Sequence, residues 1–245
     1  MSIKLGLNLT KNYSINFDLP KRSKNKIIFI ILHYTGMKKE TEAIKRLCDS
    51  KSKVSSHYFI KNNGEVLNLV PDLYAAWHAG ESYWKKSKLL NKYSIGIEIS
   101  NPGHDYEYKK FSSKQINSLI KLLRYLTKKY KIKKQNILGH SDIAPNRKKD
   151  PGEKFPWKLL AQKNLCKWHN LSESKLKKTR NLTLNPNEKK IFFKNLYAIG
   201  YPRSKGHDKN ISLIKAFQRR FRQDLINGKI DKECSIISQN LIKYK

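Results

Sequence analysis

The sequence predicts an α/β fold, with a central mixed β-sheet flanked by helices and a small C-terminal domain of three helices. Three observations support this: short apolar runs alternate with amphipathic segments of helical period, one hairpin signal joins two of the runs, and only helical periodicity follows residue 185. The 245 residues suffice for one fair-sized domain and a small companion, and 38% of them are hydrophobic. We therefore expect a globular chain with a substantial core.

Short apolar runs predict the first strands. Residues 27–32 form a continuous, largely β-branched run, which is typical of a central strand covered on both faces. A short helix is expected around residues 40–48. Asn63-Gly64 separates the apolar runs 58–60 and 66–70, and this pair favours a hairpin because both residues tolerate positive φ. Two strands are therefore expected side by side.

A further strand is predicted from strict alternation over residues 93–100. Because successive side chains of a strand point to opposite faces, Ile95, Ile97 and Ile99 share one face. Glu98 is therefore expected on the face opposite the isoleucines.

The clearest helix signal begins at Ser112, which can form a capping box with Gln115, and apolar residues then repeat at helical spacing to about Lys131. Residues 136–140 indicate another short buried strand. A long loop containing proline and lysine follows it. Strands and helices thus interleave along this part of the chain.

A domain boundary is predicted where periodicity is lost, between residues 171 and 184. Beyond it, Asn185-Pro186-Asn187 opens a helix with Gly200 as its C-cap, and apolar spacing predicts two more helices, around residues 211–225 and 236–241. The expected segments are an N-terminal arm (1–26), an α/β domain (27–168), a linker (169–184) and a helical domain (185–245).

Composition excludes several classes of protein. Lys+Arg 52 against Asp+Glu 19 gives a net charge of +33, but the lysines are spread through every segment and no nucleic-acid-binding signature is evident. We therefore expect no specific nucleic-acid partner. The three cysteines, Cys48, Cys166 and Cys234, lack a CxxC spacing, which argues against a disulfide scaffold and a thiolate zinc site. No apolar run approaches the roughly 18 to 20 residues of a transmembrane segment.

Two of the seven histidines, His33 and His140, end predicted buried strands. Ligands gather at the carboxyl ends of strands in open α/β sheets, so these two imidazoles could share one ion. A catalytic zinc site needs three N/O protein ligands and an open position for water. Asp150 is the attractive third ligand, and Asp142 is the competing carboxylate.

A positively charged residue, Lys148, precedes Asp150 by two positions. Pro151 favours an extended conformation at Asp150, and residues i and i+2 of an extended segment point the same way. Lys148 would then point toward whatever Asp150 binds. The alternative at this point is an ordinary solvated basic loop.

Six motifs that contain these residues occur in a recognisable order: HYT at residues 33–35, VSSHY at 54–58, LVP at 69–71, AWHAG at 76–80, SIGIE at 94–98 and GHSDIAPNRKKDPG at 139–152. Together they resemble the zinc-dependent N-acetylmuramoyl-L-alanine amidases of the type-2 family, which share their fold with peptidoglycan-recognition proteins. The resemblance covers about residues 27–168 and is closest to AmiD-type members. The segment AFQRRFR at residues 216–222 resembles the small peptidoglycan-binding domain appended to such enzymes.

The resemblance implies a role for each motif residue. Carried over by position, it makes His33, His140 and Asp150 the ligands of one zinc ion, Glu98 the catalytic acid/base, Lys148 the catalytic lysine, and Trp77 and His78 part of the wall near the substrate. His57 is expected to line or brace the site. His104, His169 and His207 receive no functional interpretation.

The resemblance also implies the reaction and the partner. The expected reaction is hydrolysis of the amide between the lactyl group of N-acetylmuramic acid and L-alanine, in peptidoglycan or muropeptides. The alternative is a peptidoglycan-binding protein on the same fold without catalysis. We expect a monomer. Because no hydrophobic leader or lipid-attachment cysteine is visible near Met1, we expect a cytoplasmic role in muropeptide recycling, with a periplasmic or outer-membrane-associated role as the alternative.

Overall fold

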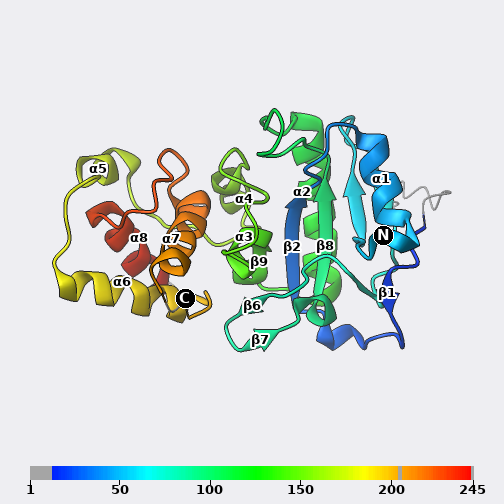
Figure 1. Cartoon of the computed structure of the whole chain (residues 1–245), viewed down its shortest axis with the longest axis horizontal. Coiled ribbons are helices and arrows are strands. Elements are labelled where there is room, and N and C mark those ends of the chain that lie inside the picture. Colours follow the sequence, from blue (N-terminus) through cyan, green and yellow to red (C-terminus); the bar gives the residue numbers. More distant parts are fainter. Residues whose placement is uncertain (1–12, 204–205, 244–245) are drawn as a thin grey trace.

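The computed structural model describes residues 13–203 and 206–243. A five-stranded sheet forms its centre, with strand order β4-β3-β8-β2-β9 (Figure 1). These strands are β2 (Phe29–Tyr34), β3 (Tyr58–Ile60), β4 (Val66–Asn68), β8 (Ser94–Ile99) and β9 (Ile137–Gly139). β2 pairs in parallel with β8 and β9, β3 pairs in parallel with β8, and β4 is antiparallel to β3. The predicted mixed sheet and its hairpin are therefore confirmed.

Eight helices accompany the sheet in the described part of the chain. They are α1 (Glu40–Cys48), α2 (Ser113–Tyr130), α3 (His140–Ile143), α4 (Trp157–Gln162), α5 (Glu173–Lys178), α6 (Pro186–Ile199), α7 (His207–Phe221) and α8 (Lys232–Lys243). Two short strand pairs lie outside the central sheet: β1 (Phe17–Asp18) with β5 (Ala75–Ala76), and β6 (Tyr83–Trp84) with β7 (Ser87–Lys88). The β1 pairing attaches the described end of the N-terminal arm to the α/β domain.

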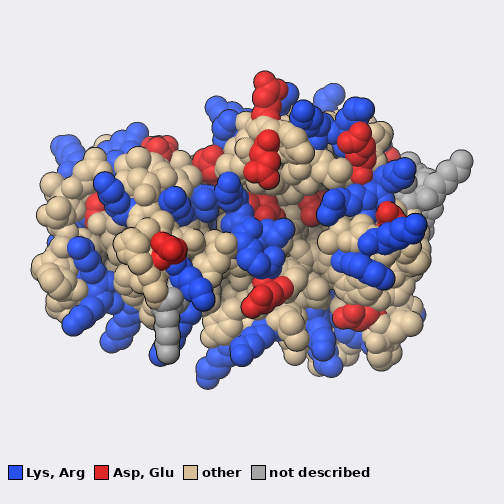
Figure 2. All heavy atoms as spheres, in the orientation of Figure 1, with Lys and Arg blue, Asp and Glu red and all other residues tan. Residues whose placement is uncertain are grey.

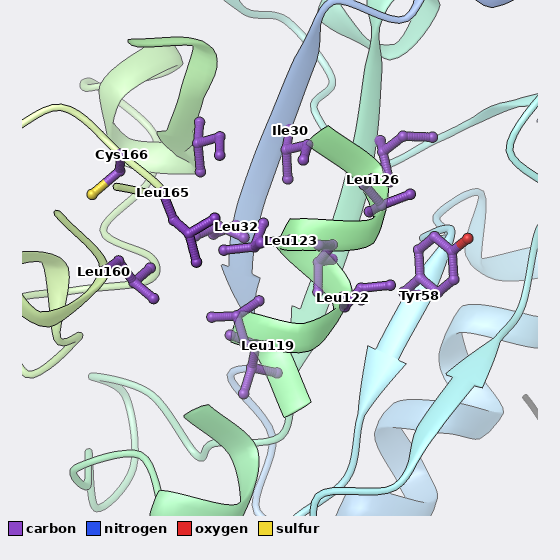
Figure 3. Close-up of a cluster of buried hydrophobic side chains, with 14 of the residues drawn as sticks. Ile30, Leu32, Tyr58, Leu119, Leu122, Leu123, Leu126, Leu160, Leu165 and Cys166 are labelled. Carbon is purple, nitrogen blue, oxygen red and sulfur yellow. The ribbon is translucent and has the colours of Figure 1, made fainter. Parts of the chain in front are cut away.

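One face of the sheet packs on α2. Ile30 and Leu32 of β2 point toward Leu119, Leu123 and neighbouring leucines of this helix (Figure 3). The isoleucines of β8 belong to the same buried cluster, as their alternation predicts. The predicted capping box closes the start of α2, because the Ser112 side chain accepts from the Gln115 backbone N–H and the Gln115 side chain accepts from the Ser112 backbone N–H.

The opposite face is divided between apolar and polar side chains. Phe29 and Ile31 of β2, with Leu138 of β9, belong to a buried cluster that includes Phe192 of α6 and Phe217 of α7. In Figure 1 the C-terminal helices lie beside β9 and α3. They therefore share a hydrophobic core with the sheet.

Some observed boundaries differ from the predicted ones. β2 begins and ends two residues later than the apolar run, which places His33 inside the strand. α7 begins at His207, before the predicted start near residue 211, because its polar first turn shows no apolar periodicity in the sequence. The helix ends at Phe221. The predicted linker contains α5, whose Leu176 is buried.

Lysine and arginine side chains are spread over the visible face of both the α/β domain and the C-terminal helices, interspersed with acidic groups (Figure 2). The positive charge is thus not gathered into one stripe on this face. Within the described ranges, no helix has the length and apolar character needed to cross a bilayer.

A buried carboxylate connects α2 to the hairpin. Asp72 accepts hydrogen bonds from the hydroxyls of Tyr58 (2.6 Å) and Tyr130 (2.6 Å) and from Lys129 Nζ (2.8 Å). Burial alone would raise the pKa of Asp72, but the three hydrogen bonds outweigh it and lower the pKa. The ionised form is therefore favoured in the folded chain, and its stabilising contribution is lost as the pH falls through the folded-state pKa.

Replacing this carboxylate should destabilise the fold. We expect Asp72→Ala to lower the free energy of unfolding by about 3 kcal/mol at neutral pH, because it leaves buried donors without their acceptor. Urea denaturation monitored by circular dichroism measures the change. The exposed Asp208 provides a control, and Asp208→Ala should cost less than about 1 kcal/mol. Equal effects of the two substitutions would contradict this assignment.

Candidate metal centre and active site

A cleft of about 590 Å³ lies at the carboxyl ends of the parallel strands. It is lined by every site residue that the sequence predicts: His33, Trp77, His78, Glu98, His140, Lys148 and Asp150. The structure therefore brings together side chains from four separate sequence motifs.

Strand register places the first two site residues. His33 of β2 is the direct partner of Glu98 in β8, so the two side chains emerge on the same face of the sheet. This is the face opposite the isoleucines, as predicted. His33 is 1% exposed.

Three ligand atoms converge at the base of the cleft. His33 Nδ1 lies 3.0 Å from His140 Nδ1 and 3.0 Å from Asp150 Oδ2, and His140 Nδ1 lies 3.1 Å from Asp150 Oδ2. His140 is the first residue of α3, directly after β9. All three residues are buried, and they form a group that can hold a metal ion.

The hydrogen-bond partners determine which ring nitrogens carry protons. His140 Nε2 lies 3.1 Å from the Ala79 carbonyl oxygen, which can only accept, so His140 Nε2 is the donor. In a neutral His140, Nδ1 therefore presents a lone pair to the group of three.

The same reasoning applies to His33 through a chain of partners. The Ser94 hydroxyl donates to the Leu90 carbonyl (2.6 Å), so it accepts from His78 Nε2 (3.1 Å). His78 Nδ1 then accepts from His33 Nε2 (3.1 Å), which leaves the His33 Nδ1 lone pair free. Burial, reinforced by His140, lowers the pKa of His33 to about 4, and burial lowers the pKa of His78 well below its usual value. Both rings are therefore neutral near pH 7.

Two imidazole lone pairs and a carboxylate oxygen about 3 Å apart repel one another unless a cation lies between them. A tetrahedral site with bonds of about 2.0–2.1 Å separates neighbouring ligand atoms by about 3.3 Å, close to the observed spacing. The donor set thus fits a metal ion.

The two competing carboxylates have different environments. Asp142 points away from the group of three, because its Oδ2 accepts from the Gly139 backbone N–H (2.8 Å) and its Oδ1 accepts from the Tyr201 hydroxyl (2.7 Å). Asp150 lies at the start of a turn with Pro151, and its main-chain carbonyl accepts from the Ser141 backbone N–H (2.9 Å). Lys148 lines the same cleft.

Glu98 lies in an environment suited to proton transfer. Burial, reinforced by the charge of Asp150, raises the pKa of Glu98 well above its ordinary value, and Lys148 opposes this shift. Glu98 Oε2 is buried and has no hydrogen-bond partner in the described part of the chain. A carboxylate with a raised pKa can both accept and return a proton near neutral pH.

His78 lies behind His33, at the bottom of the cleft. Its ring covers Gly96 of β8 so closely that a Cβ at this position would lie 2.4 Å from His78. The centroid of the His57 ring lies 5.6 Å from that of the His78 ring, and its Nδ1 accepts from the Gly96 backbone N–H (3.0 Å). Burial, reinforced by Arg22, lowers the pKa of His57 to about 3. His57 is thus placed as a brace beneath the site.

Trp77 lies at the rim of the cleft. Its indole Nε1 donates to Asp18 Oδ1 of β1 (2.7 Å), so the N-terminal arm helps to position it.

Sequence reasoning missed an aromatic cluster beside the ligand loop. The Tyr34 hydroxyl lies 2.8 Å from His104 Nδ1, His104 stacks on Tyr108, and the Tyr108 hydroxyl donates to the carbonyl of Pro151 (2.7 Å). This cluster connects the strand of His33 to the loop of Asp150. The one sequence feature that could have indicated this cluster is Gly152. Its φ is +82°, and a Cβ there would lie 2.4 Å from the Tyr108 hydroxyl.

Comparisons with known proteins identify the family of this chain. Residues 23–153 match the family model for N-acetylmuramoyl-L-alanine amidase. The chain is 33% identical to N-acetylmuramoyl-L-alanine amidase AmiD of Escherichia coli over 237 residues, covering 89% of this chain and 83% of AmiD.

Solved structures extend the similarity to the whole fold. E. coli AmiD in complex with the substrate anhydro-N-acetylmuramic acid-L-Ala-D-γ-Glu-L-Lys has a TM-score of 0.80 and 32% identity, covering 93% of each chain. AmpDH3 of Pseudomonas aeruginosa in complex with anhydromuramic pentapeptide has a TM-score of 0.78 and 28% identity, covering 96% of this chain and 98% of AmpDH3. The chain therefore belongs to the N-acetylmuramoyl-L-alanine amidase family of enzymes.

Proposed function

We propose that this amidase depends on zinc and hydrolyses the amide between the lactyl group of N-acetylmuramic acid and L-alanine in peptidoglycan or its fragments. The observation that carries the proposal is the convergence of His33 Nδ1, His140 Nδ1 and Asp150 Oδ2 within 3.0–3.1 Å of one another. Two nitrogens and one oxygen form a donor set typical of catalytic zinc. The anhydromuramyl peptides bound to AmiD and AmpDH3 support a muropeptide substrate.

Glu98 and Lys148 have separate roles in the proposed hydrolysis. When bound, zinc would polarise the scissile carbonyl and make water acidic enough to attack near neutral pH. Glu98 takes a proton from the attacking water and returns it to the departing L-alanine nitrogen, as its raised pKa favours. Lys148 supplies a positive charge for the oxyanion that develops on the carbonyl oxygen.

The cellular setting belongs to the same proposal. A muropeptide substrate suits a role in cell-wall turnover or recycling, and we propose that this role is cytoplasmic. Fractionation with an antibody against the chain tests the compartment independently of the chemistry.

Removal of a metal ligand should remove the metal. We expect His33→Ala and Asp150→Ala each to lower zinc affinity by more than about 100-fold, because each leaves only two protein donors. Dialysis against buffered zinc followed by elemental analysis measures the bound metal. The exposed His207 of α7 provides a matched control, and His207→Ala should keep the wild-type zinc content. Full zinc occupancy in His33→Ala would refute the ligand assignment.

Glu98→Gln separates metal binding from catalysis. The amide cannot accept the water proton, so we expect turnover to fall by about 10²–10⁴-fold while zinc content stays at the wild-type level. Hydrolysis of a soluble muropeptide at saturating substrate, together with elemental analysis of the same sample, gives both values. Loss of zinc in this variant would show that Glu98 holds the metal instead.

The bond cleaved can be identified from its products. Incubation with an intact muropeptide and with its 1,6-anhydro form should release, from at least one of them, the free sugar and a peptide with an L-alanine N-terminus. Mass spectrometry distinguishes this pair from products of cleavage within the peptide. Zinc-loaded protein that releases only shorter peptides from either substrate would rule out the proposed bond.

A further inference from the structure

Two C-terminal residues reach the short helix that begins with His140. The Tyr201 hydroxyl donates to Asp142 Oδ1 at 2.7 Å, and Arg220 Nη1 lies 3.8 Å from Asp142 Oδ2. Tyr201 follows α6 and Arg220 belongs to α7, so both come from the helical region that the sequence places outside the α/β domain. All three side chains are at most 3% exposed.

Asp142 connects these contacts to the metal centre. Its Oδ2 accepts from the Gly139 backbone N–H at 2.8 Å and thereby closes the single turn of α3 around His140. The next residue of this turn, Ser141, donates its backbone N–H to the Asp150 carbonyl at 2.9 Å. α3 therefore carries one predicted metal ligand and holds the backbone of another.

Packing keeps the Tyr201 ring in place. The ring meets Trp84 of β6 edge to face at a centroid distance of 4.9 Å, and Gly200 allows this approach because a Cβ there would lie 2.5 Å from the Trp84 ring. Leu138 and Phe217 belong to the same buried cluster. Tyr201 and Asp142 are 1% and 2% exposed, and both line a cavity of about 710 Å³ together with Trp84. Their buried hydrogen bond defines the position of Asp142.

We propose that Tyr201, supported by Arg220, is a positioning residue for the metal ligand His140, acting through Asp142. The C-terminal helices thereby contribute to metal affinity without touching the metal or the substrate. This inference rests on the proposed zinc site. It assigns to the helical region a role inside the amidase centre, in addition to any contact that this region makes with cell wall.

Tyr201→Phe tests the proposal, because it removes one hydroxyl and keeps the ring. We expect the dissociation constant for zinc to rise about 10-fold, in the range found when outer-shell partners of metal ligands are removed. Competition with a chromophoric chelator, with zinc as the only added ligand, measures this constant. Tyr197→Phe, the same change at a partly exposed residue of α6, should alter it by less than about 2-fold.

A packing variant distinguishes positioning from a general loss of stability. Phe217→Leu disturbs the same interface, where the Phe217 ring meets the Tyr201 ring at a centroid distance of 6.5 Å, but keeps both the Tyr201 hydroxyl and the Asp142 carboxylate. If Tyr201→Phe weakens zinc binding more than Phe217→Leu does at an equal loss of unfolding free energy, positioning is supported. Equal weakening, or unchanged affinity in Tyr201→Phe, overturns the proposal.

Two further outcomes are also decisive. If Tyr201→Phe does not fold, Arg220→Met removes the other contact to Asp142 and the Nη2 hydrogen bonds to the Ile137 (3.2 Å) and Lys167 (3.4 Å) carbonyls, while keeping an unbranched apolar side chain over Trp157. The same comparison with Phe217→Leu applies. A wild-type chain that binds no zinc refutes the zinc-dependent function and this inference with it. If Tyr201→Phe and Arg220→Met both bind zinc with the wild-type affinity, this inference is refuted while the zinc-dependent function stands.

Discussion

The mutual repulsion of three electron-pair donors is the constraint on which this site depends. His33 Nδ1, His140 Nδ1 and Asp150 Oδ2 lie 3.0–3.1 Å apart in a buried place, where such an arrangement is unfavourable without a cation. The hydrogen bonds around the rings exclude the tautomers that would relieve the repulsion. The fold thus holds the donors in a geometry that a metal ion completes.

The parallel sheet makes this arrangement possible. His33 and His140 are 107 residues apart in sequence, yet the side-by-side pairing of β2 and β9 brings their carboxyl ends together. His78 orients the His33 ring and the Ala79 carbonyl orients the His140 ring, while the Ser141 backbone N–H holds the main-chain carbonyl of Asp150. The AWHAG motif therefore supplies outer contacts for both imidazoles.

What could be predicted from the sequence depended on local geometry. The side of the sheet on which Glu98 lies follows from a period of two residues, which needs no knowledge of the rest of the chain. The α2 capping box follows from Ser112 and Gln115 in the same way. The contact of His78 with His33 could not be predicted, because it depends on a loop crossing Gly96. The hydrogen bond from the Ser141 backbone N–H of α3 to the Asp150 carbonyl likewise joins segments that no local pattern relates.

The packing of the C-terminal helices against the sheet was not predicted, for a related physical reason. A continuous apolar run indicates that both faces of β2 are covered, but it does not say by which segment. In the structure, Phe29 and Ile31 on one face of β2 are covered by the C-terminal helices, and His33, two residues further on the same face, opens into the cleft. One strand face therefore joins the shared hydrophobic core to the candidate metal site. Because the core and the site adjoin on a single strand, packing of the C-terminal helices against β2 lies next to the side chains proposed to hold the metal.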